Sequence, residues 1–244
     1  PVLELKKIIN PILLEQYNNL VYTSSGWIPC ENTFQKISSC ISENFLERLF
    51  IERLESKTAL FSKLLEQSKN NWEAVLFQSL AKGFGLNVNG DSFLTVAQSV
   101  PFSLVRKLQS KPLALEALFL GQAGLLEDSV EDGYYIQLHK MYKTYQHDFS
   151  LSQEGVINPH FFRLRPHNFP TIRLSQLAWL YENNTSLFDK LSDLTTVPDF
   201  YQMLNSQTSE YWQDHFTFGK RSSKRKKSLT RGFLDLLIVN VIIP

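Results

Sequence analysis

The chain contains few of the residues that build disulfide frameworks, metal sites or disordered segments. Its 244 residues include only two cysteines, Cys30 and Cys40, whose spacing fits neither a zinc motif nor a CxxC pair. So few cysteines are typical of a reducing compartment, and we expect a cytoplasmic protein with no metal or other cofactor. Ten glycines against 18 phenylalanines, with 43% hydrophobic residues, exclude a disordered chain and predict a packed core.

No signal-peptide pattern is visible in the sequence, and we expect no apolar segment long enough to span a membrane. Its longest apolar run, residues 233–244, is too short for a bilayer and is interrupted by polar residues. The chain begins at Pro1 without a methionine and stops inside that run. We therefore expect a fragment of a longer polypeptide that forms a single helical domain over 1–244, with 1–148 and 149–244 as an alternative subdivision.

No complete active site can be recognised. The histidines show neither HExxH nor HxH spacing, the GxSxG nucleophile motif is missing, and neither cysteine has a nucleophile context. Glu4-Leu5-Lys6 matches the E-x-K pattern of metal-dependent nucleases only nominally, because no upstream acid accompanies it. We expect no catalytic residue and no metal ligand here, and no catalysis by this chain alone.

Apolar residues recur at helical spacing along most of the chain, and alternating runs are almost absent. The pattern predicts an all-α, multi-helix globular domain of roughly ten helices, with one short strand at Val2–Leu5. Asn71 is expected to cap a helix, and the small residues of Gly121–Gly124 predict close helix packing. Helices are expected over residues 12–20, 42–69, 72–84, 92–99, 101–108, 113–126, 134–147, 171–181, 187–194, 198–204 and from residue 230.

The segment Phe161–Leu174, called here the arginine loop, combines arginines, prolines and phenylalanines. Its prolines disfavour helix before them, and Thr171 is expected to cap the helix that follows. This predicts a rigid, non-helical segment that presents Arg163, Arg165 and Arg173. The guanidinium groups either tie loop carbonyls and carboxylates together inside the protein, or bind phosphate, which suits their planar fork. The sequence leaves both interpretations open.

A second cationic segment, the basic run, covers residues 219–231 and contains no acidic residue. Its cations are Lys220, Arg221, Lys224, Arg225, Lys226, Lys227 and Arg231. Since the formal charge of the whole chain is only +1, the remainder is acidic. Such a cluster attracts phosphate backbones, and the nearby Trp212, Phe216 and Phe218 add stacking surfaces. The alternatives are a solvated loop, or a linker held against the acidic body.

Several stretches, taken together, carry a family resemblance. They are Gly26-Trp27-Ile28-Pro29-Cys30-Glu31, the pattern R-L-R-P-x-N-F-P-T-I-R-L in the arginine loop, Ser209-Glu210-Tyr211-Trp212 through Phe218-Gly219-Lys220, and Phe119-Leu120-Gly121-Gln122-Ala123-Gly124. In this order they resemble one bacterial family of uncharacterised conserved proteins, the domain of unknown function numbered twenty-eight fifty-one. The resemblance implies the helical C-terminal portion of a longer protein. It further implies that the absent N-terminal part is similar to restriction-endonuclease-like nucleases; no catalytic residue or cofactor comes with it.

Two functions follow as hypotheses. In the first, this chain binds nucleic acid or phosphate as accessory to the missing N-terminal part of the same polypeptide. The binding residues would be Arg163, Arg165, Arg173, Lys220, Arg221, Lys224, Arg225, Lys226 and Lys227. In the second, the chain is a non-enzymatic protein–protein interaction or structural domain, with an exposed apolar patch near residues 1–5 and the last helix. We expect no membrane partner in either case.

Overall fold

The computed structural model describes residues 9–22 and 31–242, which are predominantly helical. The predicted all-α class with roughly ten helices is confirmed. The chain divides into two compact units, Pro1–Ser56 and Lys57–Pro244. The predicted strand at residues 2–5 and the motif around Trp27 lie outside the described residues. The subdivision after residue 148 stays a prediction.

The first unit consists of α1 (Pro11–Tyr22), α2 (Glu31–Phe34) and the N-terminal part of α3 (Ser39–Gln67). Pro11 occupies the first helical position of α1, where its missing N–H costs nothing, and the Asn10 side chain accepts from Ile12 N at 3.0 Å. Arg48 and Glu52 form an i,i+4 ion pair at 2.8 Å. No described residue of this unit is buried, so much of its apolar surface faces solvent.

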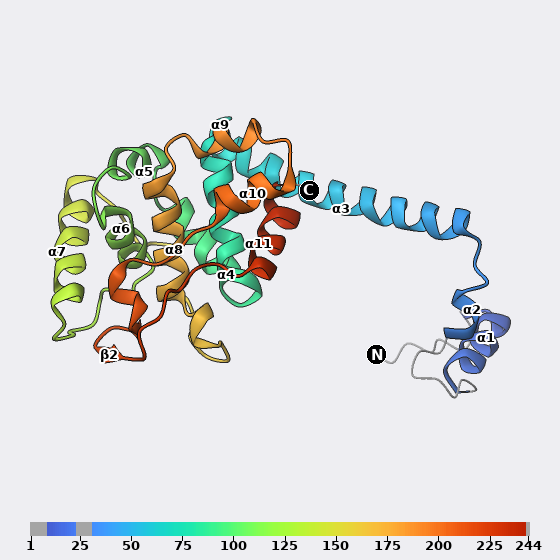
Figure 1. Ribbon diagram of the computed structural model, residues 1–244. Coiled ribbons are helices and arrows are strands. Elements are labelled where there is room, and N and C mark those ends of the chain that lie inside the picture. Colours follow the sequence, from blue (N-terminus) through green and yellow to red (C-terminus); the bar gives the residue numbers. More distant parts are fainter. Residues whose placement is uncertain (1–8, 23–30, 243–244) are drawn as a thin grey trace, which may run out of the picture. The chain divides into compact units, whose positions relative to one another are not determined.

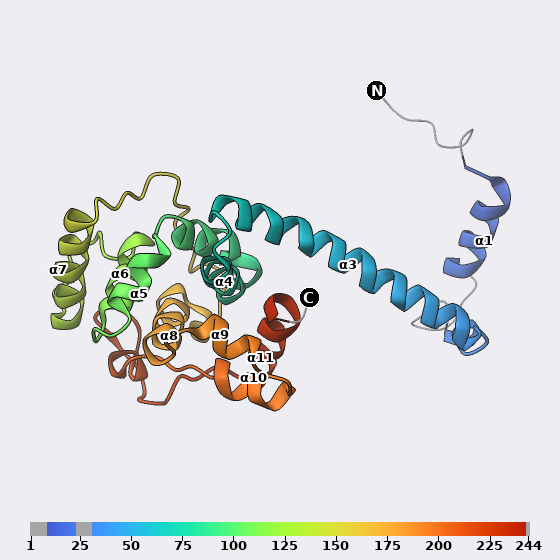
Figure 2. The same ribbon diagram turned by 90° about the horizontal axis from the view of Figure 1, so that it is seen from above.

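The second unit is built on α4 (Trp72–Gln98), α6 (Ala114–Gln122), α7 (Gly133–Asp148) and α8 (Pro170–Asn183). The helix α6 packs against both α7 and α8, and α8 also packs on α4 (Figures 1 and 2). Phe77 of α4, Leu118 of α6 and Leu177 of α8 are almost completely buried where these helices meet. Asn71 caps α4 as predicted, because its side chain accepts from Ala74 N at 3.1 Å.

The close contact of α6 with α7 depends on Gly121. A Cβ at this position would lie 2.1 Å from Cγ of Tyr142, so no larger residue fits without movement of the aromatic ring. The Tyr142 hydroxyl donates to Gln122 Oε1 at 2.7 Å, next to this contact. The prediction that the small residues of this segment serve helix packing is confirmed at Gly121.

Shorter elements surround the central helices of the second unit. They are α5 (Phe102–Leu108), η2 (Pro166–Asn168), α9 (Leu187–Ser192), α10 (Val197–Leu204), η3 (Glu210–Gln213), α11 (Arg231–Leu237) and the π-helical η4 (Ile238–Ile242). The expected last helix is present, and Thr230 caps it by accepting from Phe233 N at 3.3 Å. Among the helices in the described part of the chain, none combines the length and the apolar character needed to cross a bilayer.

One predicted helix boundary is wrong because glycines allow a close backbone approach. The helices expected over 72–84 and 92–99 belong to one element, α4, which contains a kink at Leu86 with φ 53° and ψ −157°. A Cβ at Gly85 would lie only 2.7 Å from the Gly90 nitrogen, so the kinked backbone requires glycine at this position.

A small antiparallel sheet, which the sequence did not predict, leads into the start of the basic run. Its strands are β1 (His215–Thr217) and β2 (Lys220–Arg221), and Gly219 in the connection has φ +70°. The carbonyl of Phe216 in β1 accepts from Thr171 Oγ1 at 2.7 Å. Thr171 was predicted as an N-cap, but α8 begins one residue earlier, so its hydroxyl is available to hold β1 against α8.

Candidate anion-binding surface

The exposed part of the arginine loop is held in place from both sides. Phe161 packs edge-on against Phe169 with ring centroids 5.2 Å apart. The buried Asn89 of α4 pairs with the His160 backbone, donating to its carbonyl at 2.9 Å and accepting from its N–H at 2.7 Å. Between these anchors, Arg163 takes a left-handed conformation with φ 62°. These contacts anchor the loop. The predicted non-helical conformation is wrong for η2 and for the residues from Pro170 onward, which belong to α8, and the predicted rigidity stays a prediction.

Two of the three arginines of the loop are presented to solvent, and the third is not. Arg163 and Arg165 are exposed. Arg173 lies in α8 and is buried, donating to Gln176 Oε1 at 2.9 Å and to Asn168 Oδ1 at 2.6 Å. Burial lowers the pKa of Arg173 to about 10. The expectation that all three are presented by a non-helical segment is wrong for Arg173, which has internal partners instead.

The basic run is also exposed with one exception. Lys220 and Arg221 on β2, and Lys224, Arg225 and Lys226 after it, are exposed. Lys227 is only 2% exposed, and its ammonium donates to the carbonyls of Trp212 and of His215, the latter at 2.9 Å. The expectation of a fully solvent-facing run is therefore wrong at Lys227, which serves as an internal tie between the basic run and β1.

The arginine loop and the basic run meet at His167. The guanidinium Nη2 of Arg225 lies 2.5 Å from His167 Nε2, and the imidazole packs edge-on against Phe216 with centroids 5.3 Å apart. Burial, followed by the charges of Arg225, Lys227 and Arg173, lowers the pKa of His167. A neutral His167 can accept a hydrogen bond from Arg225, so the contact joins the two segments without adding an acidic group.

The cations of this surface differ in their acidic neighbours. Lys224 pairs with Glu210 at 3.5 Å, and with Arg221 it lines a pocket of about 510 Å³. That pocket also contains the acids Glu131, Asp132, Glu210 and Asp214, together with Tyr211 and His215. By contrast, no ion pair with a carboxylate is found, among the described residues, for the four exposed cations of what we call the cationic patch. These are Arg163, Arg165, Arg225 and Lys226.

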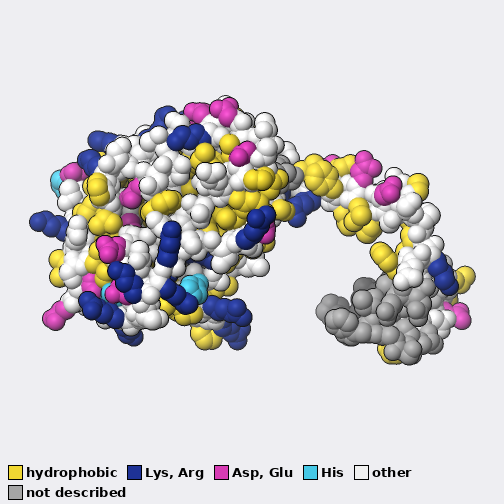
Figure 3. Space-filling model, in the orientation of Figure 1, with side chains coloured by type: hydrophobic (Ala, Val, Ile, Leu, Met, Phe, Trp, Pro, Cys, Tyr) yellow, Lys and Arg dark blue, Asp and Glu magenta, His cyan; other side chains and the backbone are white. Residues whose placement is uncertain are grey.

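Figure 3 shows Lys and Arg side chains gathered on the face of the second unit formed by the loop before α8 and the segment after β2. An aromatic side chain accompanies the patch, because Phe162 is 76% exposed and its ring lies 5.2 Å from the Arg163 guanidinium carbon. The arrangement offers guanidinium groups that make no ion pair with a carboxylate of the described residues, beside an exposed aromatic ring. Such groups contact phosphates and stack on bases.

The pocket beside the patch is held by a carboxylate and an aromatic stack. Asp132 accepts from Tyr211 OH at 2.9 Å and caps α7 through Tyr134 N and Tyr135 N. Burial alone would raise the pKa of Asp132, but these hydrogen bonds lower it below its usual value. The Tyr211 ring stacks on His215, whose Nδ1 lies 2.7 Å from Asp214 Oδ1. Each of these polar groups is engaged in fixing the turn, so we assign no reaction to them.

Sequence reasoning missed the buried carboxylate of Glu116 in α6. It accepts from Tyr134 OH at 2.6 Å, Ser175 Oγ at 2.9 Å, Ser209 Oγ at 3.3 Å and Trp212 Nε1. The pKa of Glu116 is raised, because the effect of burial exceeds the lowering by the four hydrogen bonds. Ser209 and Trp212 of the motif are thereby explained, because both donate to a carboxylate in the core. The available signal was a single acid within the otherwise apolar helix expected over 113–126.

No metal centre accompanies these features: in residues 9–22 and 31–242, no group of three or more His, Cys, Asp or Glu side chains is arranged to hold an ion.

Comparison with protein-family models matches a family described as a protein of unknown function, over residues 1–244. Neither the curated proteins nor the solved structures include a match.

Proposed function

Since this chain belongs to the family DUF2851, whose description names no activity, we propose a function from its own surface: it binds nucleic acid through the cationic patch. The observation that carries the proposal is the contact between Arg225 and His167. It brings two cationic segments, far apart in the sequence, onto one surface, where the four cations of the patch make no ion pair with a carboxylate of the described residues. The positive charge of such a surface is not neutralised by those residues, so it can attract a polyanion.

The chemistry of the patch favours phosphate over other anions. Guanidinium groups bind phosphate oxygens with two parallel hydrogen bonds, and Arg163, Arg165 and Arg225 supply three of the four charges. Phe162, exposed beside Arg163, offers a stacking face for an unpaired base. Arg173 and Lys227 take no part in this proposal beyond positioning, because both are buried and bonded internally. In this arrangement the chain binds and does not cleave, and serves as accessory to a nuclease-like part of the same polypeptide.

The test removes four charges from the patch and compares the loss with the same number removed elsewhere. The variant replaces Arg163, Arg165, Arg225 and Lys226 by alanine. The matched control replaces Lys63, Lys111, Lys140 and Lys190, which are also exposed, by alanine. Binding of labelled single-stranded and duplex DNA and RNA is measured by fluorescence anisotropy between about 50 and about 200 mM salt.

We expect the patch variant to bind weakly and to lose about one unit of salt slope for each phosphate contact removed, while the control stays near the parent. Both variants should keep the parent melting temperature, since the replaced side chains are exposed. If the two variants lose affinity equally, or the parent does not bind at low salt, the patch has no such role. Cleavage of the probe by this chain would contradict a purely binding function.

The second hypothesis, a protein-interaction domain, has one specific observation in its favour. Leu236 in α11 and Val239 in η4 are 50% and 49% exposed, so the last helix does carry apolar side chains on the surface. The other half of the expected patch, residues 1–5, lies outside the described residues. This hypothesis predicts that Leu236→Ser with Val239→Ser abolishes binding to a protein partner, while the patch variant leaves it intact.

A further inference from the structure

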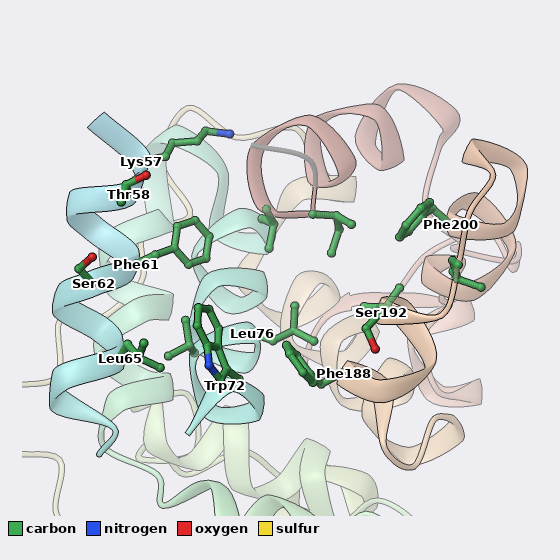
Figure 4. Close-up of a pocket in the computed structure, with 15 residues that line it drawn as sticks. Lys57, Thr58, Phe61, Ser62, Leu65, Trp72, Leu76, Phe188, Ser192 and Phe200 are labelled. Atoms are coloured by element: carbon green, nitrogen blue, oxygen red, sulfur yellow. The ribbon is translucent and has the colours of Figure 1, made fainter. Parts of the chain in front are cut away.

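An apolar pocket of about 530 Å³ lies in the second unit, lined mainly by residues of α3, α4, α9, α10 and η4. Phe61 of α3 and Leu76 of α4 point into it, and Phe200 lies across from them (Figure 4). Apolar side chains of this kind limit the size of a ligand but do not specify its chemistry, so we assign none to this pocket. His167 differs from it, because the charges around the imidazole define the chemistry of a partner.

His167 lies in η2, where the arginine loop meets the basic run, and it is exposed. Its Nε2 lies 2.5 Å from Nη2 of Arg225, and its ring packs edge-on against Phe216. Since a guanidinium group can only donate, Nε2 of His167 is the acceptor in this contact and carries no hydrogen. The imidazole is therefore neutral while it is bonded to Arg225.

The charged groups that face His167 from other elements are cations. They are Arg225 and Lys227 in the segment after β2, and Arg173 in α8. On its own segment, the exposed Arg165 comes two residues earlier. Among the described residues, no carboxylate forms an ion pair with this imidazole. Burial, followed by the three cations of the other elements, lowers the pKa of His167 and disfavours its charged form.

A phosphate bound at this junction would reverse the balance of charge. An opposite charge within about 4 to 6 Å favours the charged form of a titrating group. A phosphate oxygen beside both side chains can accept from Nη2 of Arg225 and, once the imidazole has taken up a proton, from Nε2 of His167. The two nitrogen atoms that share one hydrogen in the protein alone would then both donate to the same anion.

We propose that His167 is a phosphate contact beside the cationic patch and takes up one proton when a nucleic acid binds. This inference rests on the proposed function, because it needs a polyanion on the patch. The complex then holds a proton that the free protein does not hold, so a fall in pH favours the complex. Affinity should therefore rise as the pH falls.

The test uses the whole chain and a single-stranded oligothymidylate of about 20 nucleotides, which covers the site size of common single-strand binding modules. Its ends are hydroxyls, because a terminal phosphate would itself titrate near about pH 6. The pKa of each histidine is followed by NMR of its imidazole Cε1–H group, with and without the oligonucleotide at low salt. The His167 signal is identified by its loss in His167→Gln.

Affinity is measured in parallel by fluorescence anisotropy, with a dye that does not titrate, between about pH 5 and about pH 8. The parent is compared with His167→Gln, whose amide oxygen can still accept from Arg225. The matched control is His147→Gln, at an exposed histidine of α7. Melting temperatures verify that each variant is folded.

We expect the pKa of His167 to rise when the oligonucleotide binds, while that of His147 changes little. His167→Gln should weaken binding about tenfold more at about pH 5 than at about pH 8, which corresponds to a rise of one unit in the pKa of one group. His147→Gln should follow the parent at every pH.

The outcomes separate this inference from the proposed function. If the parent binds but the pKa of His167 does not change, the inference is wrong and the proposed function stands. If His167→Gln weakens binding equally at both ends of the pH range, the side chain only positions Arg225, and the inference is again wrong. If the parent does not bind at low salt, the proposed function and the inference both fail.

Discussion

Arg165 and Arg173 belong to one sequence pattern but lie in opposite environments. Arg165 is exposed, whereas Arg173 is buried, bonded to two amide side chains and positioned 3.7 Å above the ring of Phe233. The internal interpretation of the arginine loop therefore holds for Arg173, while phosphate binding by Arg165 stays a prediction. Sequence reasoning could not assign them, because exposure depends on where α8 begins and on the contact of α8 with α11.

This difference predicts opposite effects of the same substitution. Arg173→Ala should lower the free energy of unfolding by about 2 to 4 kcal/mol, because Gln176 and Asn168 lose their donor inside the protein. Arg165→Ala should change it by less than about 0.5 kcal/mol. Urea denaturation followed by circular dichroism measures both. Equal effects of the two substitutions would contradict the internal role assigned to Arg173.

Glu182 gives a pH dependence whose sign can be stated. Burial, followed by the charge of Glu116, raises the pKa of Glu182 from 4.5 to about 7. In this interval the folded chain holds a proton that the unfolded chain releases, so the free energy of unfolding falls as pH rises from 4.5 to about 7. Glu182→Gln removes this dependence.

The stability gained by Glu182→Gln relative to the parent should therefore grow across that interval and level off above it. Thermal melts of the two chains at a series of pH values test this. Glu154→Gln, at an exposed position, is the control and should follow the parent at every pH. Parallel curves for the parent and Glu182→Gln would show that the carboxyl is not perturbed by burial.

At the scale of elements, the contact between α6 and α7 has the least room for change. Gly121→Ala would place a methyl group 2.1 Å from Tyr142 Cγ, so α7 or the ring must move. We expect a loss of about 2 to 4 kcal/mol, with disruption of the Tyr142–Gln122 hydrogen bond. Gly133→Ala on α7 is the control, because no other described part of the chain comes within 4 Å of the place where its methyl group would lie. A near-neutral Gly121→Ala in urea denaturation would contradict the tight packing.

Helices could be located from periodicity because their apolar residues recur at helical spacing, and α4, α7 and α11 also have a capping side chain. The expected helix 134–147 differs by one residue at each end from α7, Gly133–Asp148. The kink in α4 could not be located in this way, since it depends on the approach of Gly85 to Gly90. The pair Asn89-Gly90, which is typical of a turn, equally fits a helix end. The strands β1 and β2 were missed because two- and three-residue strands are too short for an alternating pattern.

At the scale of the whole molecule, burial is confined to one of the two units. In the described part of the chain, every buried residue lies between Leu64 and Val241. We therefore expect residues 57–244 to unfold cooperatively with a melting temperature close to that of the whole chain. Differential scanning calorimetry of the two chains tests this, and hydrogen exchange should show rapid exchange in α1. A large drop in melting temperature on removal of residues 1–56 would contradict it.

The cationic residues could be predicted from sequence, but their meeting could not. Charge counts alone identify the basic run and the arginine loop, since both stand out in an otherwise acidic chain. Their junction depends on His167, Phe216 and Arg225, which come together only because β1 is held against α8. The burial of Lys227 was equally hidden, because its two carbonyl partners belong to a turn that has no sequence signature of cation binding.

The environment of Lys227 has a consequence for host–guest chemistry. Two carbonyl oxygens, from Trp212 and His215, and the face of Phe216 surround its ammonium, as in receptors for alkylammonium ions. Lys227→Gly would leave this cage in place with a channel shaped like the lost side chain. Added n-butylammonium should then raise the melting temperature of the variant, while butanol, equally long but uncharged, should not. The cavity left by the lost side chain would thus bind an alkylammonium ion, and the rise in melting temperature would measure that binding.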